Sequence, residues 1–196
     1  MEILRAEDGG TAATEAWLEN RVRRYGAHSL FLPAGDTPKP LYARWRKNPP
    51  AYLAGMRLLQ VDDVTTGTSK GLFARFFREE LPALTVVAPE KEESADLAIL
   101  GLGTNGHVAF HEPGLPMSFR FGEVDLANDT AARLKLEPGT KGITYGVGAF
   151  VNAKAILLVV RGEGKREVFE KLKLGDPSVP ASGLLSHPDL TVLTDL

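Results

Sequence analysis

The stretch Asp96 to Gly114, DLAILGLGTNGHVAFHEPG, decides the fold of this sequence. It begins with an apolar run, LAIL at 97–100, which is typical of a strand buried on both faces of a parallel sheet. Glycines follow at once, and glycine lets the backbone turn sharply and approach a ligand closely. Ligands bind at the carboxyl ends of the strands in open α/β sheets. The turn after this strand is therefore a candidate site.

This turn carries three polar side chains, Asn105, His107 and Glu112. A histidine beside a carboxylate is suited to proton transfer near neutral pH. From the spacing alone, an ordinary β-turn with a surface histidine is an equally good interpretation, because a short motif without structural context is weak evidence.

Strands and helices alternate along the rest of the chain. The predicted strands are 2–6, 28–33, 56–61, 85–88, 97–100, 123–127, 155–160 and 190–194. The predicted helices are 11–24, 39–47, 69–80, one that ends at 174, and 181–186, while 141–151 is interpreted as a glycine turn followed by a helix. This alternation predicts an α/β fold, a Rossmann-like doubly wound and mainly parallel sheet, in a single domain over residues 1–196.

Composition narrows the functional classes. A formal net charge of −2 gives no electrostatic reason to expect a nucleic-acid partner or an anionic membrane. No apolar run is long enough to span a bilayer, and the first residues do not read as a signal peptide. The absence of cysteine excludes disulfides and thiolate metal sites and fits a cytoplasmic protein. With four histidines, we expect no multi-histidine metal site.

The segment from Gly101 to Pro113, GLGTNGHVAFHEP, resembles the signature of the glucosamine-6-phosphate deaminase family, roughly G-(I/L/V)-G-x-(D/N)-G-H-(I/V)-(A/G)-F-N-E-P. The clear departure is His111, where the family usually has asparagine. The related 6-phosphogluconolactonases share the start of the signature but lack its F-N-E-P tail, so the tail favours the deaminase branch. The resemblance covers most of the chain from Leu30 onward.

The resemblance implies conversion of an amino sugar phosphate, glucosamine 6-phosphate, to fructose 6-phosphate and ammonia without a cofactor or metal. His107 would open the sugar ring, Glu112 would fix its tautomer, and Asn105 would orient the group. Asp62 lies in VDDV, which resembles the family's M-D-E-Y. It would therefore be the base that moves a proton from C2 to C1.

A phosphate site is also implied, because LPAGDTP at 32–38 resembles the family's phosphate loop L-P-T-G-(G/S)-T-P. AAR at 131–133 lies where the family has A-N-x-R, and GEGK at 162–165 resembles its G-x-x-K. The resemblance therefore implies that the substrate's phosphate binds to Gly35, Asp36, Thr37, Arg133 and Lys165. Asp36 replaces a small residue of that loop and brings a negative charge. Its carboxylate either points into the site, where it would repel a phosphate, or caps the helix that follows. We expect the cap, since aspartate is a common N-cap.

Two other functions remain open from the sequence. One is lactone hydrolysis by the same histidine, which would not need Asp62. The other is a sugar-phosphate sensor without catalysis, although no basic or helix-turn-helix segment precedes residue 30. His187, in a segment similar to the family's S-A-L-Q-x-H-P, is expected to be structural. The sugar epimer stays undetermined, and so does whether the chain forms a homo-oligomer.

Overall fold

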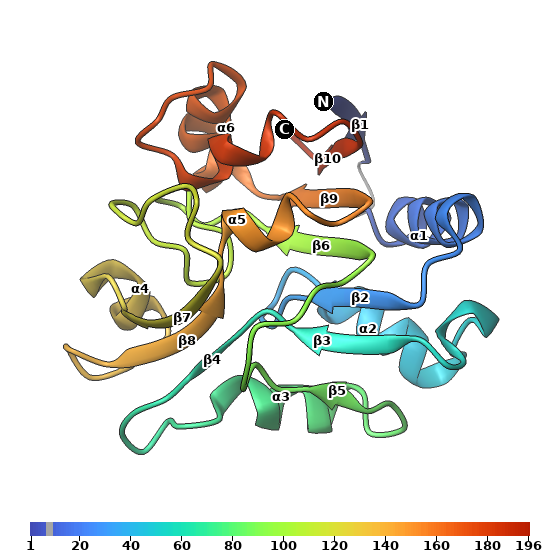
Figure 1. The fold of residues 1–196 in the computed structure, drawn as a ribbon, viewed down its shortest axis with the longest axis horizontal. Coiled ribbons are helices and arrows are strands. Elements are labelled where there is room, and N and C mark those ends of the chain that lie inside the picture. Colours follow the sequence, from blue (N-terminus) through green and yellow to red (C-terminus); the bar gives the residue numbers. More distant parts are fainter. Residues whose placement is uncertain (7–9) are drawn as a thin grey trace.

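The computed structural model describes residues 1–6 and 10–196 of the chain. Within these residues, a seven-stranded sheet has the order β1-β10-β9-β6-β2-β3-β5 (Figure 1). Its strands are β1 (Glu2–Arg5), β2 (Ser29–Leu32), β3 (Arg57–Gln60), β5 (Val86–Val87), β6 (Leu97–Gly101), β9 (Ala155–Val160) and β10 (Leu190–Thr194). Each neighbouring pair is parallel. The predicted α/β fold with a mainly parallel sheet is confirmed, whereas the single domain over 1–196 stays a prediction.

Helices cover both faces of this sheet, as a doubly wound fold requires. One face packs against α1 (Thr11–Tyr25), α2 (Lys39–Lys47) and α3 (Leu72–Glu80). The other packs against α5 (Val147–Phe150), α6 (Arg166–Lys173) and the 3₁₀ helix η3 (Pro180–Leu184). Two further 3₁₀ turns, η1 (Ala51–Leu53) and η2 (Glu163–Lys165), lie in connections.

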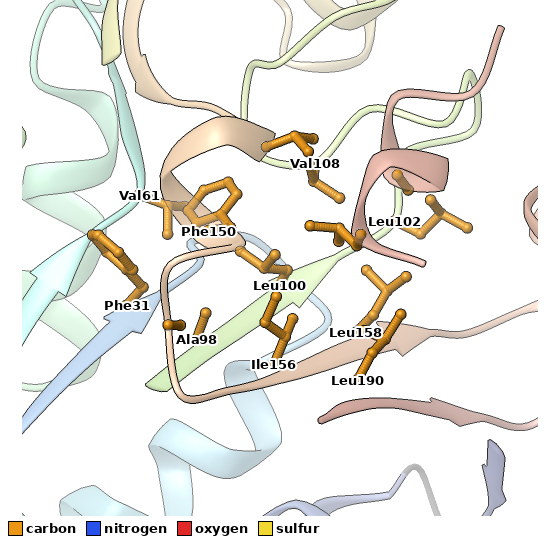
Figure 2. Close-up of a cluster of buried hydrophobic side chains, with 14 of the residues drawn as sticks. Phe31, Val61, Ala98, Leu100, Leu102, Val108, Phe150, Ile156, Leu158 and Leu190 are labelled. Atoms are coloured by element: carbon orange, nitrogen blue, oxygen red, sulfur yellow. The ribbon is translucent and has the colours of Figure 1, made fainter. Parts of the chain in front are cut away.

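Alternating side chains along the strands supply the two cores. Phe31, Leu100 and Leu158 point to the face that carries α5, where Phe150 packs among them (Figure 2). Their immediate neighbours point to the opposite face, against α1 and α2. Leu100 is 0 % exposed, and full burial of such a side chain contributes about 1.5–3 kcal/mol. The apolar run LAIL at 97–100 therefore contributes side chains to the centre of both cores.

The chain changes direction at the pair β2 and β6. From β2 it passes through α2 to β3 and then to β5 at one edge, whereas from β6 it runs to β9 and β10 towards the other edge. The carboxyl ends of β2 and β6 therefore diverge at a topological switch point, the place where ligands bind in folds of this type.

A second sheet, antiparallel, has the order β4 (Asp62–Val64), β8 (Lys141–Tyr145) and β7 (Phe121–Asp125). The prediction of a turn over the first part of 141–151 is wrong, because this part forms β8. Gly142, in β8, allows the Phe110 ring to pack closely against the strand, because a Cβ at this position would lie 2.6 Å from the ring. The helix predicted to follow is α5.

Two helices differ from the prediction. Helix α4 (Asn128–Arg133) was not predicted. Helix α3 begins at Leu72, three residues later than predicted, because Gly71 is left-handed with φ of 72°. The carboxylate of Asp63 then accepts the backbone N–H groups of Phe73 and Ala74 at 2.9 and 3.0 Å. This aspartate supplies the capping bonds that the first turn of α3 needs.

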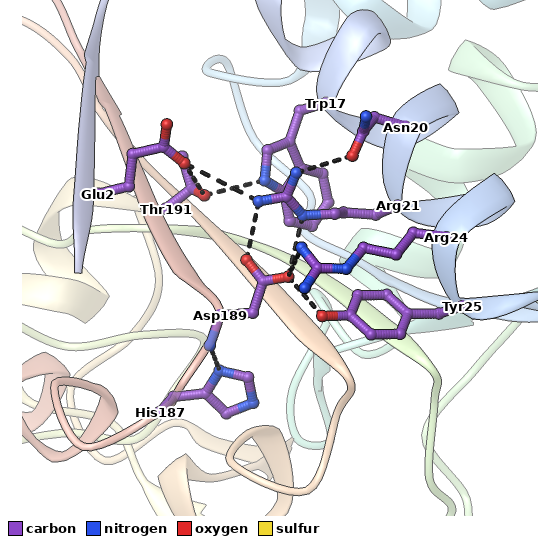
Figure 3. A network of polar contacts seen from close by, with 9 residues as sticks. All are labelled: Glu2, Trp17, Asn20, Arg21, Arg24, Tyr25, His187, Asp189 and Thr191. Carbon is purple, nitrogen blue, oxygen red and sulfur yellow. Dashed lines mark hydrogen bonds and ion pairs between the residues drawn. The ribbon is translucent and has the colours of Figure 1, made fainter.

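A polar cluster fixes α1 to the amino end of β10 (Figure 3). The carboxylate of Asp189 accepts hydrogen bonds from Arg21 at 2.8 and 3.0 Å and from Tyr25 at 2.7 Å. Burial alone would raise the pKa of Asp189, but these hydrogen bonds and the charges of Arg21 and Arg24 outweigh burial and lower it.

We expect Asp189→Asn to reduce the free energy of unfolding by about 2 kcal/mol at pH 7, the contribution of hydrogen bonds to a charged group. Because the pKa of Asp189 is lower in the folded protein, its stabilisation is complete above about pH 4, the ordinary value. The stabilisation is lost as the pH falls further, so the difference between the two proteins should shrink. Urea unfolding at pH 7 and at pH 3.5 measures this.

Glu163→Gln, which removes an exposed ion pair with Arg166, serves as the control and should leave the unfolding free energy nearly unchanged. An equal loss of stability in both variants, or a pH-independent loss at Asp189, would contradict this account.

Candidate active site

A cavity of about 320 Å³ opens at the carboxyl ends of β2, β3, β6 and β9. It brings together predicted residues from five separate segments of the chain. Those that line it are Gly35, Asp36, Thr37, Asp62, His107, Arg133 and Lys165. Glu112 and Asn105 reach the cavity through their contacts with His107. The cavity coincides with the topological switch point between β2 and β6.

The imidazole of His107 lies directly on Gly103. The backbone N–H of Gly103 donates to the carbonyl of His107 at 2.8 Å, which closes the turn after β6. A Cβ at position 103 would lie 2.4 Å from Nε2 of the ring. The glycine is therefore required because no other residue leaves room for the histidine.

The partners of His107 define its tautomer. Nη2 of Arg133 lies 3.1 Å from Nε2, and a guanidinium can only donate. Nε2 is therefore the unprotonated acceptor, and the proton of the neutral ring is on Nδ1. Nδ1 lies 3.4 Å from Oε2 of Glu112 and 3.5 Å from the hydroxyl of Thr130.

Glu112 is buried and remains ionised. Burial alone would raise its pKa, but the interactions with His107, Thr130 and Asn105 outweigh burial and lower the pKa to about 2. Nδ2 of Asn105 donates to Oε2 of Glu112 at 2.9 Å. Oδ1 of Asn105 accepts the backbone N–H of His107 at 3.2 Å. Asn105 thus connects the carboxylate to the backbone of the histidine.

The two adjacent aspartates differ in environment. Asp63 is occupied at the start of α3, as described above, whereas Asp62 lines the cavity. Burial raises the pKa of Asp62 well above its ordinary value, and the nearby carboxylates of Asp63 and Glu112 raise it further. The Asp62 carboxylate therefore binds a proton more tightly than an exposed aspartate does.

Two cations, Lys165 and Arg133, also line the cavity. Nζ of Lys165 donates to the carbonyl of Leu102 at 2.5 Å. Burial lowers the pKa of Lys165 to about 8, and the charge of Arg133 contributes to the decrease. Two like charges held this close favour an anion between them.

The loop after β2 contributes Gly35, in a left-handed conformation with φ of 99°. The prediction that Asp36 caps α2 is wrong, because no side chain among the described residues caps this helix. The carboxylate of Asp36 is 94 % exposed and pairs with Lys39 at 2.7 Å. Lys39, one turn along, competes successfully for the carboxylate and offsets its charge at the mouth of the cavity.

Thr130 was missed by the sequence reasoning, since it lies in a region of weak periodicity. The adjacent Ala-Ala-Arg at 131–133 was the available signal.

His111 is buried outside the cavity lining, and its Nδ1 accepts the backbone N–H of Val147 at 3.0 Å. His187 lies at the amino ends of the strands, where its Nε2 contacts the carbonyl of Ala153 at 2.8 Å. This contact is consistent with a structural role.

Within residues 1–6 and 10–196, we find no cluster of three or more histidine, aspartate or glutamate side chains that would hold a metal ion. In the same part of the chain, each helix is too short or too polar to cross a membrane.

Solved structures share this fold across nearly the whole chain. A monomeric glucosamine-6-phosphate deaminase aligns with a TM-score of 0.78 at 21 % identity, covering 99 % of this chain and 97 % of its own. A 6-phosphogluconolactonase from Thermotoga maritima aligns with a TM-score of 0.75 at 17 % identity, covering 98 % of each chain. At these identities the likeness defines the fold class alone.

Sequence relatives define the family. The family model of glucosamine-6-phosphate isomerases and 6-phosphogluconolactonases matches residues 63–192. A glucosamine-6-phosphate deaminase of Bacillus cytotoxicus is 32 % identical, with 100 % of this chain and 87 % of the relative covered. A glucosamine-6-phosphate deaminase of Bacillus cereus is 40 % identical, with 91 % and 79 % covered. The chain therefore belongs to the glucosamine-6-phosphate isomerase and 6-phosphogluconolactonase family of enzymes.

We expect Gly103→Ala to displace the ring of His107 while the fold is kept, because the added methyl group overlaps Nε2. The imidazole NMR signals of His107 should shift, and those of His187, at the other end of the sheet, should not. In Gly164→Ala the added carbon meets no atom within 4 Å, so this control should leave both histidines unchanged. Unchanged His107 signals in Gly103→Ala would contradict the packing described here.

Proposed function

We propose that the chain converts glucosamine 6-phosphate to fructose 6-phosphate and ammonia. The observation that carries the proposal is the content of one cavity: a carboxyl group with a raised pKa, a histidine of fixed tautomer and two cations. Deaminase relatives at 32 % and 40 % identity support the same substrate.

Ring opening is assigned to His107. Its unprotonated Nε2 removes the proton from O1 of the sugar and returns a proton to the ring oxygen, which breaks the C1–O5 bond and leaves an aldehyde. Glu112 and Asn105 keep the other nitrogen protonated and the ring in place, the role of the carboxylate in a catalytic triad.

Proton transfer between carbons is assigned to Asp62. Its carboxylate removes the proton from C2 of the open sugar, and the carboxylic acid so formed delivers a proton to C1. In the same step O1 gains a proton and the amino group on C2 loses one, a transfer that Nε2 of His107 can relay. The product is an imine at C2 with a hydroxyl group at C1, and water hydrolyses the imine to the ketone and ammonia. The raised pKa of Asp62 suits a general base, because a carboxylate with a raised pKa is a stronger proton acceptor than an exposed aspartate.

The phosphate is assigned to Arg133, Lys165 and the loop 35–37. Arg133 has five N–H donors for phosphate oxygens. In the substrate complex its guanidinium must release Nε2 of His107, because this nitrogen has a single lone pair and needs it to accept the proton from O1. The loop adds backbone N–H groups near the start of α2. Holding this remote group orients C1 and C2 against the two catalytic side chains.

Lactone hydrolysis is the second candidate, favoured by the fold shared with solved 6-phosphogluconolactonases. In that reaction His107 would activate water, and Asp62 would have no proton to move. The role of Asp62 therefore distinguishes the two candidates.

Incubation of the purified protein with glucosamine 6-phosphate should release ammonia and form fructose 6-phosphate without added metal or nucleotide. Unphosphorylated glucosamine and 6-phosphogluconolactone are assayed in parallel. Turnover of the lactone alone would replace the proposed function with the second candidate, and turnover of no sugar phosphate would reject both.

Asp62→Asn should lower kcat by roughly 10²- to 10⁴-fold, the usual contribution of a general base. KM should change little, because the phosphate contacts are unaltered. Ring opening should persist, measured as anomer interconversion of the substrate. Asp63→Asn is the matched control. It should reduce the free energy of unfolding, because α3 loses its capping bonds, and it should lower kcat far less than Asp62→Asn does. A loss of only a few-fold in Asp62→Asn would exclude this residue as the base.

A further inference from the structure

Helix α4 (Asn128–Arg133) contacts both ring nitrogens of His107. Arg133, at its last position, reaches Nε2 at 3.1 Å. Thr130, one turn earlier, places its hydroxyl 3.5 Å from Nδ1. A single helical turn therefore meets the imidazole from two sides, although α4 is separated from His107 by about twenty residues of sequence.

The hydroxyl of Thr130 is not free to turn towards water. The residue is 1 % exposed, and a buried hydroxyl is expected to have a hydrogen-bond partner. The hydroxyl also helps to lower the pKa of Glu112, which keeps this carboxylate ionised. Thr130 thus lies against both members of the pair formed by His107 and Glu112.

The direction of these bonds follows from the tautomer. Since Arg133 donates to Nε2, Nδ1 carries the proton and cannot accept from the threonine. The hydroxyl of Thr130 therefore presents its lone pairs to the Nδ1 proton. The Nδ1 proton is then shared between two acceptors at nearly equal distances, Oε2 of Glu112 at 3.4 Å and the hydroxyl at 3.5 Å.

We propose that Thr130 is a positioning residue that acts with Glu112 to keep the proton of His107 on Nδ1 and to fix the orientation of the ring. The inference rests on the proposed role of His107 in ring opening. Valine would fill nearly the same volume as threonine, but it would lack the hydroxyl and leave the Nδ1 proton with one long contact.

The test uses Thr130→Val, Thr130→Ser and the control Thr140→Val. Thr140 is also buried, and its hydroxyl donates to the carbonyl of Glu137 at 2.6 Å, outside the cavity. In the ligand-free wild type, nitrogen-15 NMR of the imidazole should show His107 with its proton on Nδ1. Thr130→Val should show a mixture of tautomers, while Thr130→Ser and Thr140→Val should resemble the wild type.

Kinetics with glucosamine 6-phosphate give the second readout. Thr130→Val should lower kcat by about tenfold, part of the roughly 10²- to 10⁴-fold contribution of general acid–base catalysis, with KM changed less than about twofold. Thr130→Ser should restore most of kcat. A purely structural threonine would lower stability in both valine variants without a change of tautomer.

The proposal is overturned if Thr130→Val keeps the wild-type tautomer, or if Thr140→Val lowers kcat equally. If Thr130→Val fails to fold, the wild type decides: a proton found on Nε2 of His107 overturns the proposal, and a slowly exchanging hydroxyl proton on Thr130 supports it. The NMR measurements need no substrate, so they test the positioning of His107 even if the protein proves inactive on glucosamine 6-phosphate.

Discussion

The contact between the imidazole of His107 and the backbone of Gly103 is the constraint on which the rest of the site depends. It places the ring at the end of β6, where the buried centre of the sheet holds the turn rigidly. Once the ring is fixed there, Nδ1 and Nε2 face different surroundings: an ionised carboxylate and a hydroxyl on one side, a guanidinium and the open cavity on the other. A methyl group at position 103 would displace the ring, so Nδ1 and Nε2 would no longer face these two different environments.

The elements that the sequence predicted well are those determined by local pattern. LAIL at 97–100 and AILLVV at 155–160 form central strands because they are apolar throughout and are bounded by turns. The long signature after β6 led directly to His107, Asn105 and Glu112, and the structure places these three side chains together. Aspartates 62 and 63 were found as a pair, but only the structure shows that Asp63 is committed to α3 and that Asp62 faces the cavity.

The elements that the sequence did not predict depend on contacts between distant segments. β8 contains a glycine and lacks strong alternation, and it is a strand because β4 and β7 pair with it and Phe110 packs over Gly142. Helix α4 is too short for a periodic signal. Asp36 has the local features of a helix cap, yet a lysine three residues on takes its carboxylate. Whether the carboxylate of Asp36 binds backbone N–H groups or Lys39 depends on side-chain geometry, and the residue types alone do not determine that geometry.

The position of β10 between β1 and β9 constrains the order in which the chain assembles. The first strand of the sequence pairs with the last, so β1 has no neighbour in the described sheet while the ribosome still holds residues 190–194. The cavity described above has no such requirement, since the residues that line it end at Lys165. During synthesis, the segments that line the cavity can therefore meet before the edge of the sheet closes, and before Asp189 is available to bind Arg21 of α1.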